Sequence, residues 1–264
     1  MNVFISIILF LFFFPVYAKT LKTLPLVDGK QVSIVKEKEC YYWHEDEGNK
    51  KPLACVDDEL ESGFTIKDYN FDGYQDISIY NALGMVNNIY YIFIYDYKSK
   101  EFRKIKTANP TKPISACGEF YNLDVQPKTL TLFSTCRSGP VWYYDVYRYN
   151  DQGELWLYKT TEYQIQNSEI DTFPLYEITF NQNGEQLDKV AIDFDGKKFI
   201  WSIKAEKVFL YFSPEKKSKT KAYLIRNDKV EILAQKDDWI QIRYASRKGP
   251  LVSWLSLVEA TREG

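Results

Sequence analysis

Residues 144–155 read YDVYRYNDQGEL, an aromatic-rich run that ends in a polar turn and restarts on an apolar residue. Alternating strands joined by a short turn that contains glycine are typical of a β-hairpin. Aromatic residues make up 17% of the chain and suit a pleated, half-buried surface, whereas helical periodicity is hard to find. Similar units read YYIFIYDYKSKEF at 90–102, ITFNQNGEQL at 178–187 and, in a shorter form, IDFDGKKF at 192–199. We therefore expect an all-β protein.

The repeated hairpins favour a propeller-like β domain over residues 19–204. Each hairpin of this kind buries its apolar face only against its neighbour, which is how propellers and meandering sheets are built. The uneven spacing of the copies leaves an alternative, since any antiparallel protein contains such hairpins.

Residues 205–264 change to short strands separated by polar turns. In the order of these elements, and in having Trp239 at the start of one strand and Trp254 near the end of the next, this part resembles bacterial SH3 domains. The resemblance implies a small, SH3-like barrel. Asn227 and Ser253 stand where that family usually has glycine. The two tryptophans are candidates for an SH3-like ligand groove, with a place in the structural core as the alternative.

The N-terminus carries an export signal pattern. Residues 3–17 are apolar, and Val16-Tyr17-Ala18 presents small residues at the two positions that a signal peptidase reads. The run is shorter than the roughly 20 residues that span a bilayer. We expect cleavage after Ala18 and a periplasmic or otherwise extracytoplasmic protein with no transmembrane segment after cleavage. Because Met1-Asn2 lacks Lys or Arg, an uncleaved anchor is the alternative.

Four cysteines in an exported chain predict two disulfides. Of the three possible connectivities, the local pairs Cys40 with Cys55 and Cys117 with Cys136 close short, hairpin-sized loops. The chain has one histidine, His44, and no CxxC spacing, so nothing in the sequence indicates a zinc site.

Residues 68–76 read DYNFDGYQD and place oxygen-bearing side chains around a glycine turn beside a strand. Ca²⁺ takes six to eight oxygen ligands, and Gly73 permits the sharp bend that such a loop needs. The alternative is an Asx-rich turn whose side chains hydrogen-bond their own backbone. The expected ligands of a structural Ca²⁺ are the side chains of Asp68, Asn70, Asp72 and Asp76 and the carbonyl of Tyr74.

The charge differs between the two parts of the chain. Residues 204–264 hold 13 Lys and Arg against 8 Asp and Glu, and the remainder holds 21 against 28. An acidic larger part is unsuited to nucleic acid but would steer association with a cationic protein. The alternative is that each charge run is simply a solvated loop.

Residues 68–76, 90–102 and 133–149, in this order, resemble periplasmic propeller-like proteins with calcium loops of the FG-GAP type that inhibit lysozyme-like effectors. Such proteins serve as immunity proteins of bacterial secretion systems. The resemblance covers most of residues 60–165. It implies a propeller with bound calcium and an exposed loop that plugs the cleft of a secreted peptidoglycan hydrolase.

On this sequence the inhibitory loop would run from Arg137 to Tyr144. Arg, Trp and Tyr dominate interface energies, and Ser138-Gly139-Pro140 predicts a tight turn that projects them. The alternative is that the aromatics alternate into the sheet, above all Tyr144. The loop residues expected to contact a partner are Arg137, Ser138, Gly139, Trp142, Tyr143 and Tyr144.

Catalysis is not expected, because His44 sits in an acidic loop and no nucleophile has an evident activating base. Two functions remain. The first is an exported inhibitor or immunity protein that occludes a peptidoglycan hydrolase. The second is an envelope-binding or adhesion module that recognises wall peptide or glycan.

Overall fold

The computed structural model describes residues 19–25, 31–45, 48–57, 59–106, 115–163, 175–193 and 195–262. In this part of the chain, four antiparallel sheets account for nearly all of the secondary structure, which confirms the all-β class. The predicted signal sequence, residues 1–18, lies outside the described residues.

The first two sheets are four-stranded meanders in which consecutive strands pair. Sheet A contains β1 (Lys19–Pro25), β2 (Gln31–Glu37), β3 (Cys40–Glu45) and β4 (Lys51–Cys55). Sheet B contains β5 (Ser62–Lys67), β6 (Asp76–Leu83), β7 (Asn87–Asp96) and β8 (Glu101–Lys104).

Sheet C is a six-stranded meander, again in chain order. Its strands are β9 (Asp124–Gln126), β10 (Thr131–Ser138), β11 (Val141–Tyr149), β12 (Leu155–Tyr163), β13 (Leu175–Phe180) and β14 (Gln186–Ile192).

Sheet D has the order β15-β18-β19-β20-β16-β17. Its first strand lies before residue 205, the predicted start of the C-terminal domain. Within the described residues, none of the four sheets closes into a barrel. The end of this C-terminal part nevertheless lies beside its beginning, since the N–H groups of Lys204 and Ala205 donate to the carbonyl of Ala260 at 3.2 and 3.0 Å. The elements are β15 (Ile200–Ser202), β16 (Lys207–Tyr211), the short 3₁₀ turn η1 (Lys216–Ser218), β17 (Lys219–Ile225), β18 (Lys229–Lys236), β19 (Trp239–Ser246), β20 (Gly249–Ser256) and α1 (Leu257–Thr261).

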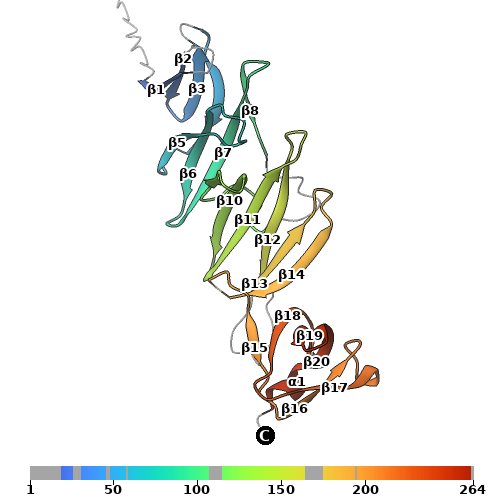
Figure 1. Cartoon of the computed structure of the whole chain (residues 1–264). Coiled ribbons are helices and arrows are strands. Elements are labelled where there is room, and N and C mark those ends of the chain that lie inside the picture. The colour runs from blue at the N-terminus through green and yellow to red at the C-terminus, as the bar shows by residue number, and fades with distance from the viewer. Residues whose placement is uncertain are drawn as a thin grey trace, which may run out of the picture.

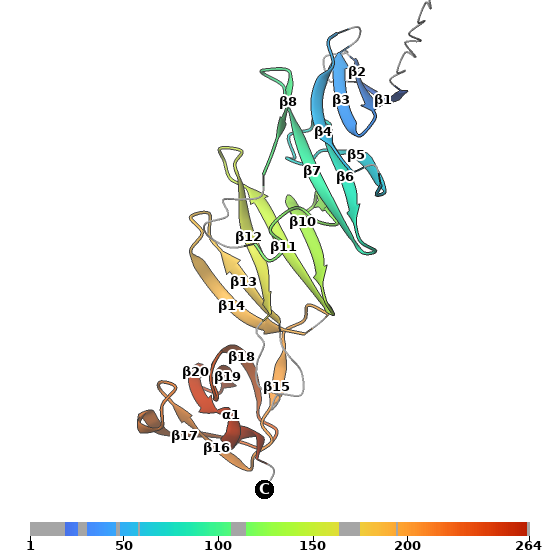
Figure 2. The same cartoon turned by 180° about the vertical axis from the view of Figure 1, so that it is seen from behind.

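The sheets follow one another along the long axis of the molecule in chain order (Figures 1 and 2). Each pair of neighbours shares an apolar core: Ile34 of sheet A packs with Ile79 of sheet B, and Ile92 of sheet B packs with Leu132 of sheet C. Tyr176, on sheet C, belongs to the core of sheet D. Burial of these faces against the next sheet is what holds the stack together.

The hairpin units recognised in the sequence end in matching turns. Asn150 Oδ1 accepts hydrogen bonds from the N–H groups of residues 152 and 154 at 3.0 and 2.8 Å. Asn181 and Asp193 accept the equivalent pairs of bonds from their own turns. An Asx side chain followed three residues later by glycine therefore sets the turn in three of the four units, and in the unit at 90–102 Asp96 begins the turn without a glycine.

Both local disulfides are present: Cys40 with Cys55 and Cys117 with Cys136. The first links cross-strand partners of β3 and β4. The second ties the segment before β9 to β10, where the buried Asp145 also accepts hydrogen bonds from the N–H groups of Ala116 and Cys117, each at 3.0 Å. Two disulfides are consistent with an extracytoplasmic protein. In the described part of the chain, no helix is long and apolar enough to cross a membrane.

Candidate functional site

The outer face of sheet C contains a cavity of about 560 Å³. Strand alternation creates it: Leu132 and Tyr147 pack against sheet B, whereas Phe133, Tyr144 and Val146 line the cavity on the opposite face. We call this cavity the sheet C groove. Its aromatic and charged lining residues are Phe133, Trp142, Tyr143, Tyr144, Arg148, Tyr158, Lys159, Glu177, Asp193 and Asp195.

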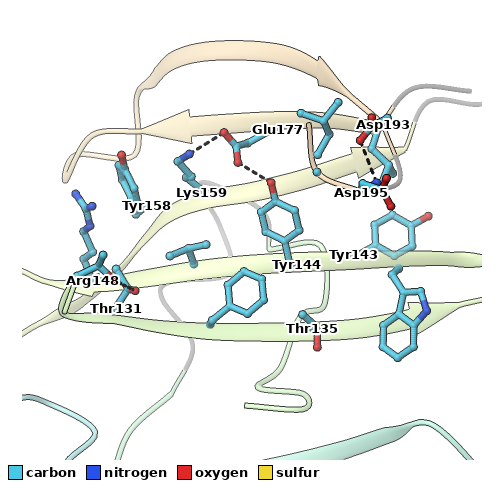
Figure 3. A pocket seen from close by; sticks show the side chains of 17 residues that line it. Thr131, Thr135, Tyr143, Tyr144, Arg148, Tyr158, Lys159, Glu177, Asp193 and Asp195 are labelled. Atoms are coloured by element: carbon cyan, nitrogen blue, oxygen red, sulfur yellow. Dashed lines mark hydrogen bonds and ion pairs between the residues drawn. The ribbon is translucent and has the colours of Figure 1, made fainter. Parts of the chain in front are cut away.

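A hydrogen-bonded trio crosses the middle of the groove on three neighbouring strands. The Tyr144 hydroxyl donates to Glu177 Oε2 at 2.5 Å, and Lys159 Nζ donates to Glu177 Oε1 at 2.7 Å (Figure 3). Burial, followed by the interaction with Glu177, raises the pKa of Tyr144 above its usual value. The phenol therefore stays protonated and keeps donating, which fixes the ring in the groove wall.

The two ends of the groove carry opposite charges. At one end the guanidinium carbon of Arg148 lies 3.6 Å from the centre of the Tyr158 ring, and its buried Nε has no hydrogen-bond partner among the residues that the structure describes. At the other end lie Asp193 and Asp195 (Figure 3). The positive charge of the guanidinium makes the Arg148 end suited to an anionic or carbonyl group of a ligand.

The residues predicted to form a projecting inhibitory loop lie in a tight hairpin. Arg137 and Ser138 end β10, Gly139 adopts a positive φ of 58° in a two-residue turn, and β11 begins at Val141. Positive φ favours glycine, so this position suits the turn.

Only the aromatic part of that predicted loop reaches the groove. Trp142, Tyr143 and Tyr144 line it as residues of the strand β11 rather than of a projecting loop. At the tip, Trp142 remains 46% exposed, and the Arg137 guanidinium carbon lies 6.0 Å from its ring centre.

The predicted calcium loop is tied together by its own side chains. Asp68 accepts three backbone N–H bonds, from Phe71 at 2.6 Å, Asp72 at 3.2 Å and Gly73 at 2.9 Å. The Asn70 amide donates to Asp72 Oδ2 at 2.7 Å, and Tyr74 N–H donates to Asp72 Oδ1 at 2.9 Å. These bonds are those of the Asx-turn alternative.

Asp76 differs from the exposed end of that loop, because its side chain is fully buried at the start of β6. It accepts backbone N–H bonds from Tyr69 at 2.7 Å and Tyr95 at 2.9 Å. Burial, with smaller contributions from Asp72 and Asp68, raises the pKa of Asp76 to about 7. Among the described residues, no group of three or more His, Cys, Asp or Glu is arranged to hold a metal ion. Carboxylate oxygens keep further lone pairs after accepting these bonds, so the loop remains a predicted calcium site.

The two tryptophans of the predicted SH3-like groove lie on the face of sheet D that is turned away from its core. Trp254 pairs across the strands with Gln241, two residues from Trp239, whereas the alternate residues of the same strand, Ile240 and Ile242, are buried. Trp239 packs edge-on against Tyr211, with ring centres 4.7 Å apart. Both indoles are half-buried.

Of the residues that line the groove, only Trp142, Tyr143 and Tyr144 were predicted as site residues from the sequence. Those that were missed include Phe133, Val146, Arg148, Tyr158, Lys159 and Glu177. Part of the signal was present, because Tyr144, Val146 and Arg148 share one face of an alternating strand. Comparison with protein-family models and with curated proteins found no match for this chain.

Proposed function

We propose that the protein is an exported, non-catalytic binding protein of the cell envelope, and that the sheet C groove holds its ligand. The observation that carries this proposal is the shape and chemistry of the groove: an aromatic trough with a fixed polar trio at its centre. A preformed site of this kind binds with little ordering cost. The two disulfides support an oxidising, extracytoplasmic location.

Wall peptide or glycan is the ligand class that we propose first. Aromatic side chains stack on sugar faces and on apolar parts of peptides, and the trio adds directed hydrogen bonds. A groove receives a ligand, whereas a plug must project, and here the turn between β10 and β11 has only two residues.

Inhibition of a secreted peptidoglycan hydrolase is the second candidate function. The exposed Trp142 beside Arg137 at the hairpin tip supports it, since these residue types are the usual centres of protein interfaces. The acidic remainder of the chain is complementary to a cationic hydrolase.

The propeller-like and SH3-like arrangements and a bound Ca²⁺ are also part of this proposal. Sheets A and B are four-stranded meanders, the unit of a propeller blade, and this supports propeller-like blades, although the sheets follow one another along one axis rather than around a centre. The return of the chain end to Lys204 supports an SH3-like arrangement of sheet D. We propose Ca²⁺ as a structural ligand of the Asp68 to Asp76 loop.

The test is binding of the chain from Lys19 onward to purified peptidoglycan and to soluble wall fragments, measured by sedimentation and calorimetry. We expect Tyr158→Ala, which removes the ring under Arg148, to weaken binding about tenfold. Tyr97→Ala, an exposed tyrosine outside the groove, is the matched control. Equal binding by both variants would reject the groove as the site.

A pull-down with the chain from Lys19 onward tests inhibition of a peptidoglycan hydrolase separately from wall binding. Capture of a peptidoglycan hydrolase whose activity falls to zero at equimolar protein, and recovers with Arg137→Ala/Trp142→Ala, is the expected result for inhibition. Recovery of wall fragments alone would exclude it in favour of envelope recognition.

A further inference from the structure

The hairpin formed by β16 and β17, in sheet D, exposes apolar side chains that its own core does not need. Phe212, at the tip, is 82% exposed, and Tyr223 and Ile225, on the edge strand, are each 51% exposed. The inner face of the hairpin is complete without them, because Val208 and Leu224 are buried in the sheet D core.

The same hairpin is strongly basic. Residues 207–226 hold six Lys or Arg and a single acidic residue, Glu215, which pairs with Lys217 at 3.1 Å. Lysines also flank the aromatic rings of the outer face: Lys219 Nζ lies 3.7 Å from the centre of the Phe209 ring, and Lys207 Nζ lies 4.1 Å from that of Tyr223. Cationic and aromatic groups therefore occupy one continuous outer surface.

The tip that presents Phe212 is held in shape. Ser218 Oγ donates to the carbonyl of Ser213 at 2.8 Å and accepts from its N–H at 3.1 Å. The N–H of Phe212 donates to the carbonyl of Ser218 at 3.1 Å. A fixed turn presents the exposed ring with little ordering cost on binding.

We propose that this β16–β17 hairpin is a docking surface for an anionic phospholipid bilayer. Phe212 enters the headgroup region, Lys216 and Lys217 at the tip contact lipid phosphates, and Lys219 and Lys207 follow on the outer face. Aromatic rings prefer the boundary between headgroups and acyl chains, and clustered lysines are attracted to an anionic surface. A soluble polyanion would engage the lysines but would leave the Phe212 ring in water, so the combination favours a bilayer.

The hairpin is independent of the sheet C groove. It lies at the C-terminal end of the stack, on a different sheet (Figure 1). Bilayer docking would thus hold the protein at a membrane while leaving the groove accessible, and it neither requires nor excludes the function proposed for the groove.

The experiment is co-sedimentation of the chain from Lys19 onward, which contains all four sheets, with vesicles of phosphatidylcholine alone or with about one third phosphatidylglycerol. We expect binding to the anionic vesicles only, and loss of binding at high salt. Lys216→Glu/Lys217→Glu should lower the partition coefficient at least about tenfold, and Phe212→Ser about tenfold.

Matched controls separate a specific surface from general charge. Lys98→Glu/Lys128→Glu makes the same charge change at exposed lysines of sheets B and C, and Met85→Ser removes a side chain that is 100% exposed. Both controls should bind as the parent does. Absence of binding to anionic vesicles, or an equal loss in hairpin and control variants with unchanged circular dichroism, would overturn the proposal. So would full retention of binding by Phe212→Ser, because a bilayer contact requires the ring.

Discussion

Asn87 pairs with the backbone of Arg137 through both atoms of its side-chain amide. Its Nδ2 donates to the carbonyl of Arg137 at 3.0 Å, and the N–H of Arg137 donates to its Oδ1 at 2.9 Å. Asn87 begins β7 of sheet B and Arg137 lies near the end of β10 of sheet C, so one side chain fixes the hairpin tip of one sheet to its neighbour.

Replacement of Asn87 by alanine should lower the free energy of unfolding by about 1–2 kcal/mol, because two backbone groups lose their partner at a partly hydrated junction. Urea titration followed by fluorescence measures this change. Gln182→Ala, in the exposed turn between β13 and β14, is the control and should stay within about 0.5 kcal/mol of the parent. An equal effect of the two substitutions would contradict a role for the amide pair.

Tyr144→Phe should destabilise the protein by about 1–2 kcal/mol, since Glu177 loses a hydrogen bond that its charge strengthens while its bond to Lys159 remains. Thermal unfolding of the variant measures the loss. Combination with Glu177→Gln tests the partnership, because the double variant should be less destabilised than the sum of the singles. Additive effects would show that the two side chains do not interact.

Reduction of the Cys117–Cys136 disulfide should cost about 3 kcal/mol, the value expected for closing a loop of roughly this length in the unfolded chain. Cys117→Ser/Cys136→Ser, compared with the parent in urea, measures it. Because Asp145 still holds residues 116 and 117 through backbone bonds, the native circular dichroism spectrum should be kept. Unfolding of the variant in the absence of urea would contradict this expectation.

Calcium should raise the melting temperature if the Asp68 to Asp76 loop binds it, since a ligand that binds only the folded state stabilises it by about 2.7 kcal/mol at 100 times its Kd. The measurement compares melting in Ca²⁺ and in chelator. Asp72→Asn is the most informative variant, because the asparagine Oδ1 can still accept from the N–H of Tyr74 while the charge is removed. Replacement of Asp68 or Asp76 would instead disturb several backbone hydrogen bonds and destabilise the fold with or without the ion. Identical melting temperatures in Ca²⁺ and chelator would reject the site.

Features that depend on residues close together in the sequence could be predicted from the sequence alone. Turns such as Asn150 to Glu154 and the pairing of Cys40 with Cys55 follow from short-range geometry, and both are present. The place of Tyr144 in a strand also follows from the local sequence. Gly139 makes the turn, and the aromatic run after it forms the second strand of the hairpin.

The groove could not be predicted in the same way. Alternation separates the two faces of β11, but it does not say which face the next sheet covers. Lys159 and Glu177 meet Tyr144 only because β12 and β13 pair beside β11 in a register that includes a bulge after Val146. No local pattern in the sequence specifies that bulge or the register that follows from it.

The strictly sequential order of sheets A, B and C has a consequence for biogenesis. If the chain is exported, as we propose, it enters its compartment from the N-terminus, and each of these sheets uses only consecutive strands. Each sheet could then form as soon as its own residues have emerged, and Cys40 would meet Cys55 before Cys117 has crossed. Folding would then be vectorial, with the first completed sheet as the template for the second and little opportunity for mispaired thiols.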